Sequence, residues 1–281
     1  MKKRLSILIG FFMVIGSITA SIRGFPYWYS FYVTGAFMFF GALDKPRSVY
    51  SLVLRGEWKR FAAIYCVTAM FGLFVDIIYG RLIGSLWHYP HLSGIWGIVV
   101  PVLIFYPFGG LQVYEIFYFV LGKASRLRPT GFKLPARLLS IIASAQIALL
   151  AIGMIAPLIL FALDSPYANE LLIMIMILVT FSFDALYYRI RKESILFEMI
   201  GLNRVYIIAF AVSWLTAVIL TEVPNVFSWE WVYTFPIGIE IFRINIIVFT
   251  FGWFFLVMVP VRIIDIVKLQ LRHFTSGPRR S

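Results

Sequence analysis

Three acidic residues stand in or beside long apolar runs, where a charged side chain is costly. Asp76 lies in "FVDIIYGRLIGSLWHYP", Glu115 lies in "GGLQVYEIFYF", and Glu222 follows the apolar run in "VILTEVP". A carboxyl group in apolar surroundings can donate or accept a proton, which is the chemistry of general acid–base catalysis and of proton-coupled transport. We therefore predict that Asp76, Glu115 and Glu222 are the catalytic candidates.

Tryptophan and tyrosine follow two of these acids at a similar distance. Asp76 precedes the letters "WHYP", and Glu222 precedes "WEWVY". Electron-rich rings stabilise a nearby positive charge, but the same residue types also gather in the aromatic belt at a membrane surface. Both explanations stay open here. If the rings bind substrate, the candidates are Trp87, Tyr89, Trp229, Trp231 and Tyr233.

Two charged pairs have a spacing that suits structure more than chemistry. Glu240 and Arg243 lie three residues apart, which places both side chains on one face of a helix. We predict that they form a structural ion pair, because a lone arginine inside the membrane would be costly. Asp184 is close enough to Arg189 in sequence for us to expect a pair at the membrane surface.

The sequence holds no clear motif for a metal or a cofactor. His88 and His91 flank a "YP" dipeptide, and two histidines with only distant carboxylates are a weak metal signal. No phosphate-binding loop, nucleotide fingerprint, HExxH or GxSxG pattern occurs. The one cysteine, Cys66, excludes an intrachain disulfide. We therefore predict neither a metal nor a cofactor.

The composition identifies the solvent in which these residues lie. Of the 281 residues, 61% are hydrophobic and 14% charged, with a mean hydropathy of +0.90, whereas soluble domains are about 45–50% apolar and about 25% charged. We predict an all-α, polytopic membrane helix bundle with about eight transmembrane helices. The "FYPFGG" stretch should break the fourth of these helices, at residues 105–110. The expected spans are 5–22, 25–42, 61–83, 94–122, 138–163, 170–188, 205–221 and 236–261.

The basic residues indicate the orientation of these spans. All but three of the 25 Lys and Arg residues fall before the first span or after the even-numbered spans. The positive-inside rule places that side in the cytoplasm, so we predict a multi-pass protein of the cell membrane with both termini cytoplasmic. The net charge of +12 then follows from topology, and we exclude nucleic acid as a partner. Residues 5–22 also have the shape of a signal peptide, but we favour an anchor over a cleaved segment.

The chain is predicted to consist of two membrane halves of four helices each. Residues 1–135 form the first half, and residues 136–281 form the second half with a basic cytoplasmic tail. The pattern of an acid followed by Trp-x-Tyr occurs once in each half. Since each half has an even number of spans, the two copies face the same side, as in a parallel internal repeat.

The stretch from residue 76 to 122 resembles the lycopene cyclase domain of heterodimer-type and fused carotenoid cyclases. Members of this family carry an Asp in a span, then a Gly-x-Trp-x-Tyr segment, then a Pro-x-Glu-Glu-x-x-x-Phe span. This chain departs from the pattern at the last element, since Tyr114 takes the place of the first of the two acids and Pro107 stands further from the acid. The matching residues are Asp76, Trp87, Tyr89, Glu115, Phe117 and Phe119.

The resemblance implies an isoprenoid or carotenoid-type cyclase that protonates a lipid-soluble polyene with a carboxylic acid. Its partners would be the lipid bilayer and a lipid-soluble isoprenoid. A proton-coupled membrane transporter and a non-catalytic multi-pass protein fit the same residues. An apolar, aromatic-lined pocket would favour the cyclase, whereas polar residues that continue to both faces would favour the transporter.

Overall fold

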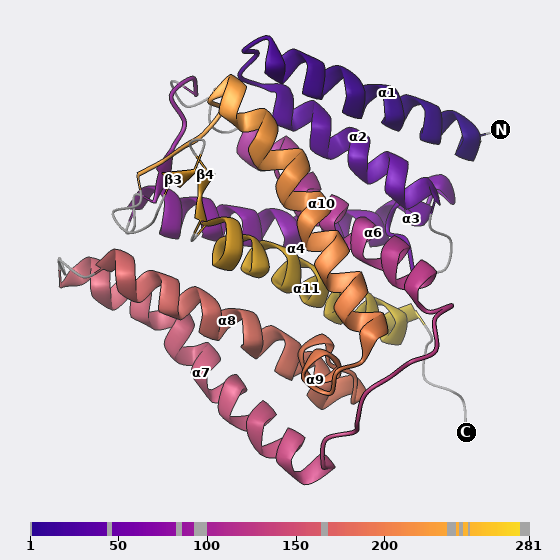
Figure 1. Cartoon of the computed structure of the whole chain (residues 1–281), viewed down its shortest axis with the longest axis vertical. Coiled ribbons are helices and arrows are strands. Elements are labelled where there is room, and N and C mark those ends of the chain that lie inside the picture. Colours follow the sequence, from indigo (N-terminus) through magenta and orange to yellow (C-terminus); the bar gives the residue numbers. More distant parts are fainter. Residues whose placement is uncertain are drawn as a thin grey trace.

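Long helices dominate the computed structural model of the chain (Figure 1). It describes residues 2–43, 47–82, 86–92, 100–163, 168–234, 240–241, 244–246 and 248–275. An all-α helical bundle of the membrane-embedded kind is confirmed, whereas the count of eight spans stays a prediction. The six helices in the described part that are long and apolar enough to cross a membrane are Lys2–Ile22, Trp58–Ile77, Val100–Ala124, Ala136–Leu160, Arg204–Ser228 and Val248–Arg272.

The same order of elements occurs twice along the chain, apart from a π-helical segment at Val75–Leu82 in the first copy and two short strands at Glu240–Ile241 and Ile244–Asn245 in the second. Two long helices are followed by a short helix, a third long helix, a strand, and a final helix that begins with a π-helical turn. The first copy is α1 (Lys2–Ile22), α2 (Trp28–Leu43), α3 (Tyr50–Leu54), α4 (Trp58–Phe74), β1 (Trp87–His88), η2 (Val100–Phe105) and α6 (Pro107–Ala124). The second copy is α7 (Ala136–Ala162), α8 (Ala168–Arg191), α9 (Ile195–Ile200), α10 (Arg204–Ser228), β2 (Val232–Tyr233), η3 (Val248–Gly252) and α11 (Trp253–Thr275).

The helices α6 and α11 form the centre of the bundle. They contact each other, and each of them also contacts α4 and α10. In matching fashion, α2 packs on α6 and α8 packs on α11. Leu111 and Phe117 of α6 and Val257 of α11 belong to the main hydrophobic core. Figure 1 shows the α7–α8 pair along the lower edge of this core and the α1–α2 pair along the upper edge.

The α1–α2 pair is held at close range by two glycines. A Cβ atom added at Gly10 would lie 2.7 Å from the Gly35 carbonyl oxygen, and one added at Gly35 would lie 2.6 Å from the Met13 Cβ. In lipid, helices associate through van der Waals packing of small residues, because lipid tails are as apolar as the side chains. The two glycines therefore set the spacing of the two helices.

Three of the predicted spans, the third, the fourth and the eighth, contain a change between π-helix and α-helix. The third continues from α4 into the π-helical segment η1 (Val75–Leu82). The predicted break in the fourth is confirmed, since η2 gives way to α6 at Pro107, where the Tyr106 N–H donates to the Pro101 carbonyl oxygen over 2.8 Å. Proline suits the first position of a helix, because its missing N–H would have no partner there.

The last span begins later than predicted. Its expected start at residue 236 lies outside the described residues, but a helix is wrong for the segment that follows, because β3 (Glu240–Ile241) and β4 (Ile244–Asn245) form an antiparallel pair before the π-helical segment η3 (Val248–Gly252). Isoleucine and valine are apolar in both states, so hydropathy does not separate a short strand from a helix. The expected basic cytoplasmic tail begins within α11 (Trp253–Thr275), which continues through Arg262 to Thr275.

Candidate functional site

An apolar cavity of about 190 Å³ lies where the two copies of the element order meet. The first copy contributes wall residues from α4 and α6, and the second contributes them from α8, α10 and α11. Gly72 lines it, and nothing lies within 4 Å of the position of its missing Cβ, so this part of the wall leaves room for a ligand. Phe251 is 53% exposed and also lines the cavity, so the cavity reaches the surface of the bundle there. The aromatic lining is Tyr29, Phe71, Trp87, Tyr89, Tyr106, Trp231, Tyr233, Phe251 and Trp253.

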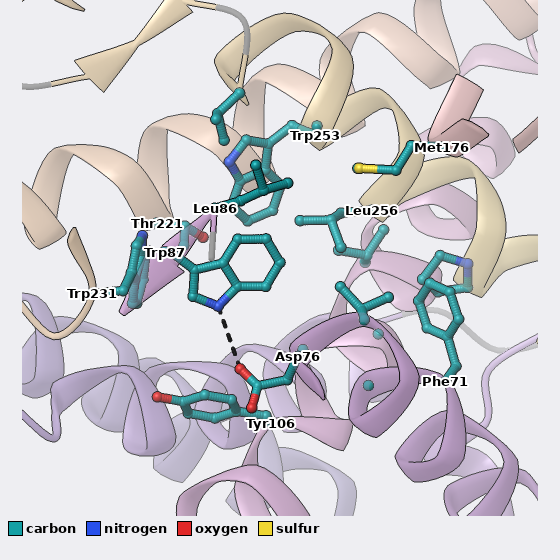
Figure 2. Close-up of a pocket in the computed structure, with 18 of the residues that line it drawn as sticks. Phe71, Asp76, Leu86, Trp87, Tyr106, Met176, Thr221, Trp231, Trp253 and Leu256 are labelled. Carbon is teal, nitrogen blue, oxygen red and sulfur yellow. Dashed lines mark hydrogen bonds between the residues drawn. The ribbon is translucent and has the colours of Figure 1, made fainter. Parts of the chain in front are cut away.

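Asp76 points into this cavity from η1. The Tyr89 hydroxyl donates to Asp76 Oδ1 over 2.7 Å, and the Trp87 indole N–H lies 3.3 Å from the same oxygen and 3.2 Å from the Tyr89 hydroxyl. Figure 2 shows the Trp87 ring between Asp76 and Trp253. Gly80 makes room for this ring, since a Cβ atom there would lie 2.7 Å from it. π-Helical turns of this kind are frequent at functional sites.

Glu222, near the end of α10, has the same type of surroundings as Asp76. The Tyr233 hydroxyl donates to Glu222 Oε1 over 2.6 Å, and the Trp231 indole N–H donates to that hydroxyl over 3.0 Å. The indole of Trp253 also donates to Glu222 Oε1, over 2.7 Å. The Glu222 side chain lies behind Tyr233 and Trp253, which line the cavity, so it acts on the cavity only through them.

A two-stranded ladder joins the two acid clusters. Strand β1 pairs antiparallel with β2, with Trp87 opposite Tyr233 and His88 opposite Val232. The Thr234 N–H extends the ladder by donating to the Leu86 carbonyl oxygen over 3.0 Å. The repeated Trp-x-Tyr motif of the sequence is therefore a pair of partner strands, in which the Trp of one copy faces the Tyr of the other.

Glu230 is a buried acid at the rim of this site that sequence reasoning missed. It is 1% exposed, and it accepts hydrogen bonds from the Tyr29 N–H and from the Tyr106 hydroxyl, each over 2.9 Å. Burial raises the pKa of Glu230 to about 8, against the lowering effect of these two bonds. Its place between Trp229 and Trp231 was the available signal, because both tryptophans were already candidates for the substrate pocket.

The other predicted site residues lie elsewhere. Glu115 is fully buried, but it accepts from the Ser48 hydroxyl and from the Tyr50 N–H, so it caps the start of α3 and does not line the cavity. Trp229 ends α10 with a left-handed backbone (φ 55°) and a side chain 41% exposed. Glu240 belongs to a strand, and Arg243 lies outside the described residues, so their ion pair stays a prediction.

A second buried polar cluster lies at the far end of α11. Arg262 is 3% exposed, and it donates to Asp184 over 2.5 Å and to Asp265 over 3.2 Å. Asp184 also accepts from the first two N–H groups of α9, each over 3.0 Å. The expected pair of Asp184 with Arg189 is wrong, since Arg189 contacts Ser140 and Ser144. The sequence assigned Arg262 to the basic cytoplasmic face, and only packing reveals Asp184 as its partner.

No group of three or more His, Cys, Asp or Glu side chains that could hold a metal occurs in the described part of the chain. The chain matches no known family model, no curated protein and no solved structure. The wall of the cavity combines one carboxyl group, Asp76, with tryptophan and tyrosine rings, and none of its described lining residues is basic.

Proposed function

We propose that this membrane protein is a cyclase for a lipid-soluble isoprenoid, and that Asp76 is its proton donor. The observation that carries the proposal is the meeting of one carboxyl group with an aromatic-lined, apolar cavity inside a bundle of membrane-type helices. Ring closure on a polyene begins with the protonation of a C=C bond, which needs a carboxylic acid in a site that excludes water. The resemblance to the lycopene cyclase domain agrees with this proposal through Asp76, Trp87 and Tyr89.

In the proposed reaction, Asp76 transfers its proton to the outer carbon of a C=C bond. The electron pair of that bond forms the new C–H bond and leaves a carbocation on the neighbouring carbon. A second C=C bond of the same chain attacks this carbon and closes a ring. The resulting cation then returns a proton to the Asp76 carboxylate and becomes a new C=C bond. The product is an isomer of the substrate, so the reaction needs no oxidant and no cofactor.

The surrounding rings have two roles in this mechanism. The faces of Trp87, Trp231 and Trp253 stabilise the carbocation, because the negative face of an aromatic ring attracts positive charge. Tyr89 donates a hydrogen bond to Asp76, which stabilises the carboxylate that remains after proton transfer. Glu222 is a positioning residue, since it holds Tyr233 and Trp253 through its Oε1 atom.

The size of the cavity supports binding of one end of the substrate. An apolar cavity of about 150 Å³ holds a benzene molecule, so about 190 Å³ accommodates a six-membered ring. The remainder of a long isoprenoid would leave the cavity beside Phe251 and lie among the lipid chains. A soluble entry path is not required, because the substrate partitions into the bilayer.

The proton-coupled transporter remains the second candidate. The repeated order of elements with a cavity between the copies favours it, because many transporters bind their substrate between internal repeats. Against it, Val257 and Val261 of α11 are fully buried and lie between Trp253 at the cavity and the Arg262 cluster. Along this face of α11, apolar side chains therefore stand between the two polar regions, which favours the cyclase.

Expression in a host that accumulates acyclic isoprenoids tests the cyclase. The wild-type protein is expected to convert part of the acyclic pool into cyclic isomers of equal mass, detected by chromatography with mass spectrometry. Asp76→Asn removes the acidic proton with little change in shape, and it should lower product by about 10²–10⁴-fold, the usual contribution of a general acid.

The matched control is Glu193→Gln, which neutralises an exposed acid outside the cavity and should leave the product level unchanged. Asp76→Glu keeps the carboxyl group and should retain part of the activity. Equal isomer profiles for the wild type and the Asp76→Asn variant would reject the cyclase for the precursors present. Proton uptake into vesicles that depends on Asp76 would then support the transporter.

A further inference from the structure

A basic pocket lies at the opposite end of the bundle from the clusters around Asp76 and Glu222. It has a volume of about 140 Å³, and α3, α4 and α11 border it. Arg55 and Arg60 line one side, and Lys268 and Arg272, one helical turn apart on α11, line the other. No acidic side chain is among the described lining residues. The pocket thus brings together four basic side chains from segments far apart in the sequence.

From this pocket we infer a binding site for a phosphate group, and we propose that an anionic lipid headgroup supplies it. Arginine and lysine are the side chains that most often bind phosphate, since arginine offers a planar fork of donors and lysine a compact charge. The inference is independent of the proposed cyclase, because it uses no residue of the cavity.

The two arginines on the α3–α4 side of the pocket share one carboxylate. Glu57 accepts from both Arg55 and Arg60, each over 2.6 Å, so one carboxylate serves two guanidinium groups. The Arg55 guanidinium has five N–H donors, and its bond to Glu57 uses one of them. Lys268 donates to the Tyr114 hydroxyl over 2.9 Å and to the Arg47 carbonyl oxygen, which leaves one of its three N–H donors for a ligand.

The shape and the surroundings of the pocket favour a lipid over an ion from solution. A single water needs about 10–15 Å³, so about 140 Å³ admits a phosphate group with part of its glycerol ester. Leu52, Ile64 and Leu271 also line the pocket, and they offer an apolar surface to the ester and the first carbons of an acyl chain. Nearby, Trp58 is 60% exposed at the start of α4, where an amphipathic ring suits the headgroup region of a membrane.

The side of the membrane on which the pocket is predicted to lie agrees with this ligand. The four basic residues belong to the side that the positive-inside rule assigns to the cytoplasm, and the cytoplasmic leaflet carries most of the anionic lipid. Basic pockets between transmembrane helices on that side are known to bind acidic headgroups. The ligand class is therefore a phosphate diester with net negative charge, such as phosphatidylglycerol.

Titration of the full-length protein in a neutral detergent tests the site, with bound lipid counted by native mass spectrometry. Phosphatidylglycerol is expected to bind more tightly than phosphatidylcholine. The Arg55→Gln/Arg60→Gln variant should bind phosphatidylglycerol on the order of tenfold more weakly, because it removes two charge-assisted contacts. Arg272→Lys keeps the charge but loses the planar fork of donors, so it should weaken binding less than the double variant does.

The control variant is Lys2→Gln/Lys59→Gln, which removes the same charge from exposed positions on the basic side that do not line the pocket. It should bind phosphatidylglycerol as the wild type does. Equal weakening in this control would show a diffuse basic surface and would overturn the proposal. Inorganic phosphate that displaces phosphatidylglycerol at equal concentration would overturn the lipid as the source. Thermal unfolding of each variant separates lost binding from lost folding.

Discussion

Trp87 and Tyr233 are partners across the β1–β2 ladder, although they come from different halves of the chain. The Trp87 indole lies against Asp76, and the Tyr233 hydroxyl donates to Glu222. The short ladder therefore fixes the distance between the two acid clusters. A change at either strand should disturb both clusters.

Glu222→Ala should destabilise the protein by about 1–3 kcal/mol, because it leaves two buried donors, the Tyr233 hydroxyl and the Trp253 indole, without their acceptor. Glu222→Gln keeps an acceptor oxygen and should cost less. Thermal unfolding in detergent, followed by tryptophan fluorescence, measures both. Glu193→Ala, at an exposed position, is the control. Equal melting temperatures for the Glu222→Ala and Glu193→Ala variants would contradict the prediction.

Arg262→Met should be the most damaging single change at the far end of α11. It leaves Asp184 and Asp265 buried without their basic partner, and loss of one partner of a buried ion pair costs about 3–5 kcal/mol. Combining it with Asp184→Asn should restore part of the loss, because one uncompensated charge disappears. Size-exclusion chromatography and thermal unfolding report the outcome. Arg189 is exposed, so Arg189→Met is the control and should have little effect on stability. A loss of stability in this control as large as that of Arg262→Met would argue against the ion pairs of Arg262.

Glu230 should make stability depend on pH. Its pKa is about 8 in the folded protein and near 4.5 when solvated, so between these values the folded state holds a proton that the unfolded state has lost. The free energy of unfolding should therefore fall as the pH rises from 4.5 to 8, by at most about 1.4 kcal/mol per pH unit. The difference in melting temperature between the wild type and Glu230→Gln measures this contribution. A melting-temperature difference between the two proteins that stays constant from pH 4.5 to 8 would contradict the prediction.

Gly10→Ala should weaken the α1–α2 pair, because the added Cβ would lie 2.7 Å from backbone atoms of α2 and the helices must move apart. A cost of about 1–3 kcal/mol is typical of overpacking. Gly16→Ala on the same helix is a matched control, since nothing lies within 4 Å of its added Cβ and alanine favours the helix. Thermal unfolding should rank the Gly10→Ala variant below the wild type and the Gly16→Ala variant at or above it.

The amino-acid sequence by itself determined the class of the protein and part of its site. Hydropathy and charge are local properties of a segment, so they predicted the apolar helices, the break at Pro107 and the repeated pattern of an acid with Trp-x-Tyr. Asp76, Trp87 and Tyr89 could be grouped in advance because they lie close together along the chain.

Only the tertiary structure decided which buried charge meets which partner. Glu115 looked like a second acid of the Asp76 site but caps α3, Glu230 meets Tyr106 from another half of the chain, and Arg262 pairs with Asp184. The physical reason is that a buried polar group must find its partner within hydrogen-bond distance. In a bundle, that neighbour comes from whichever helix packs beside it, which spacing along one segment does not specify.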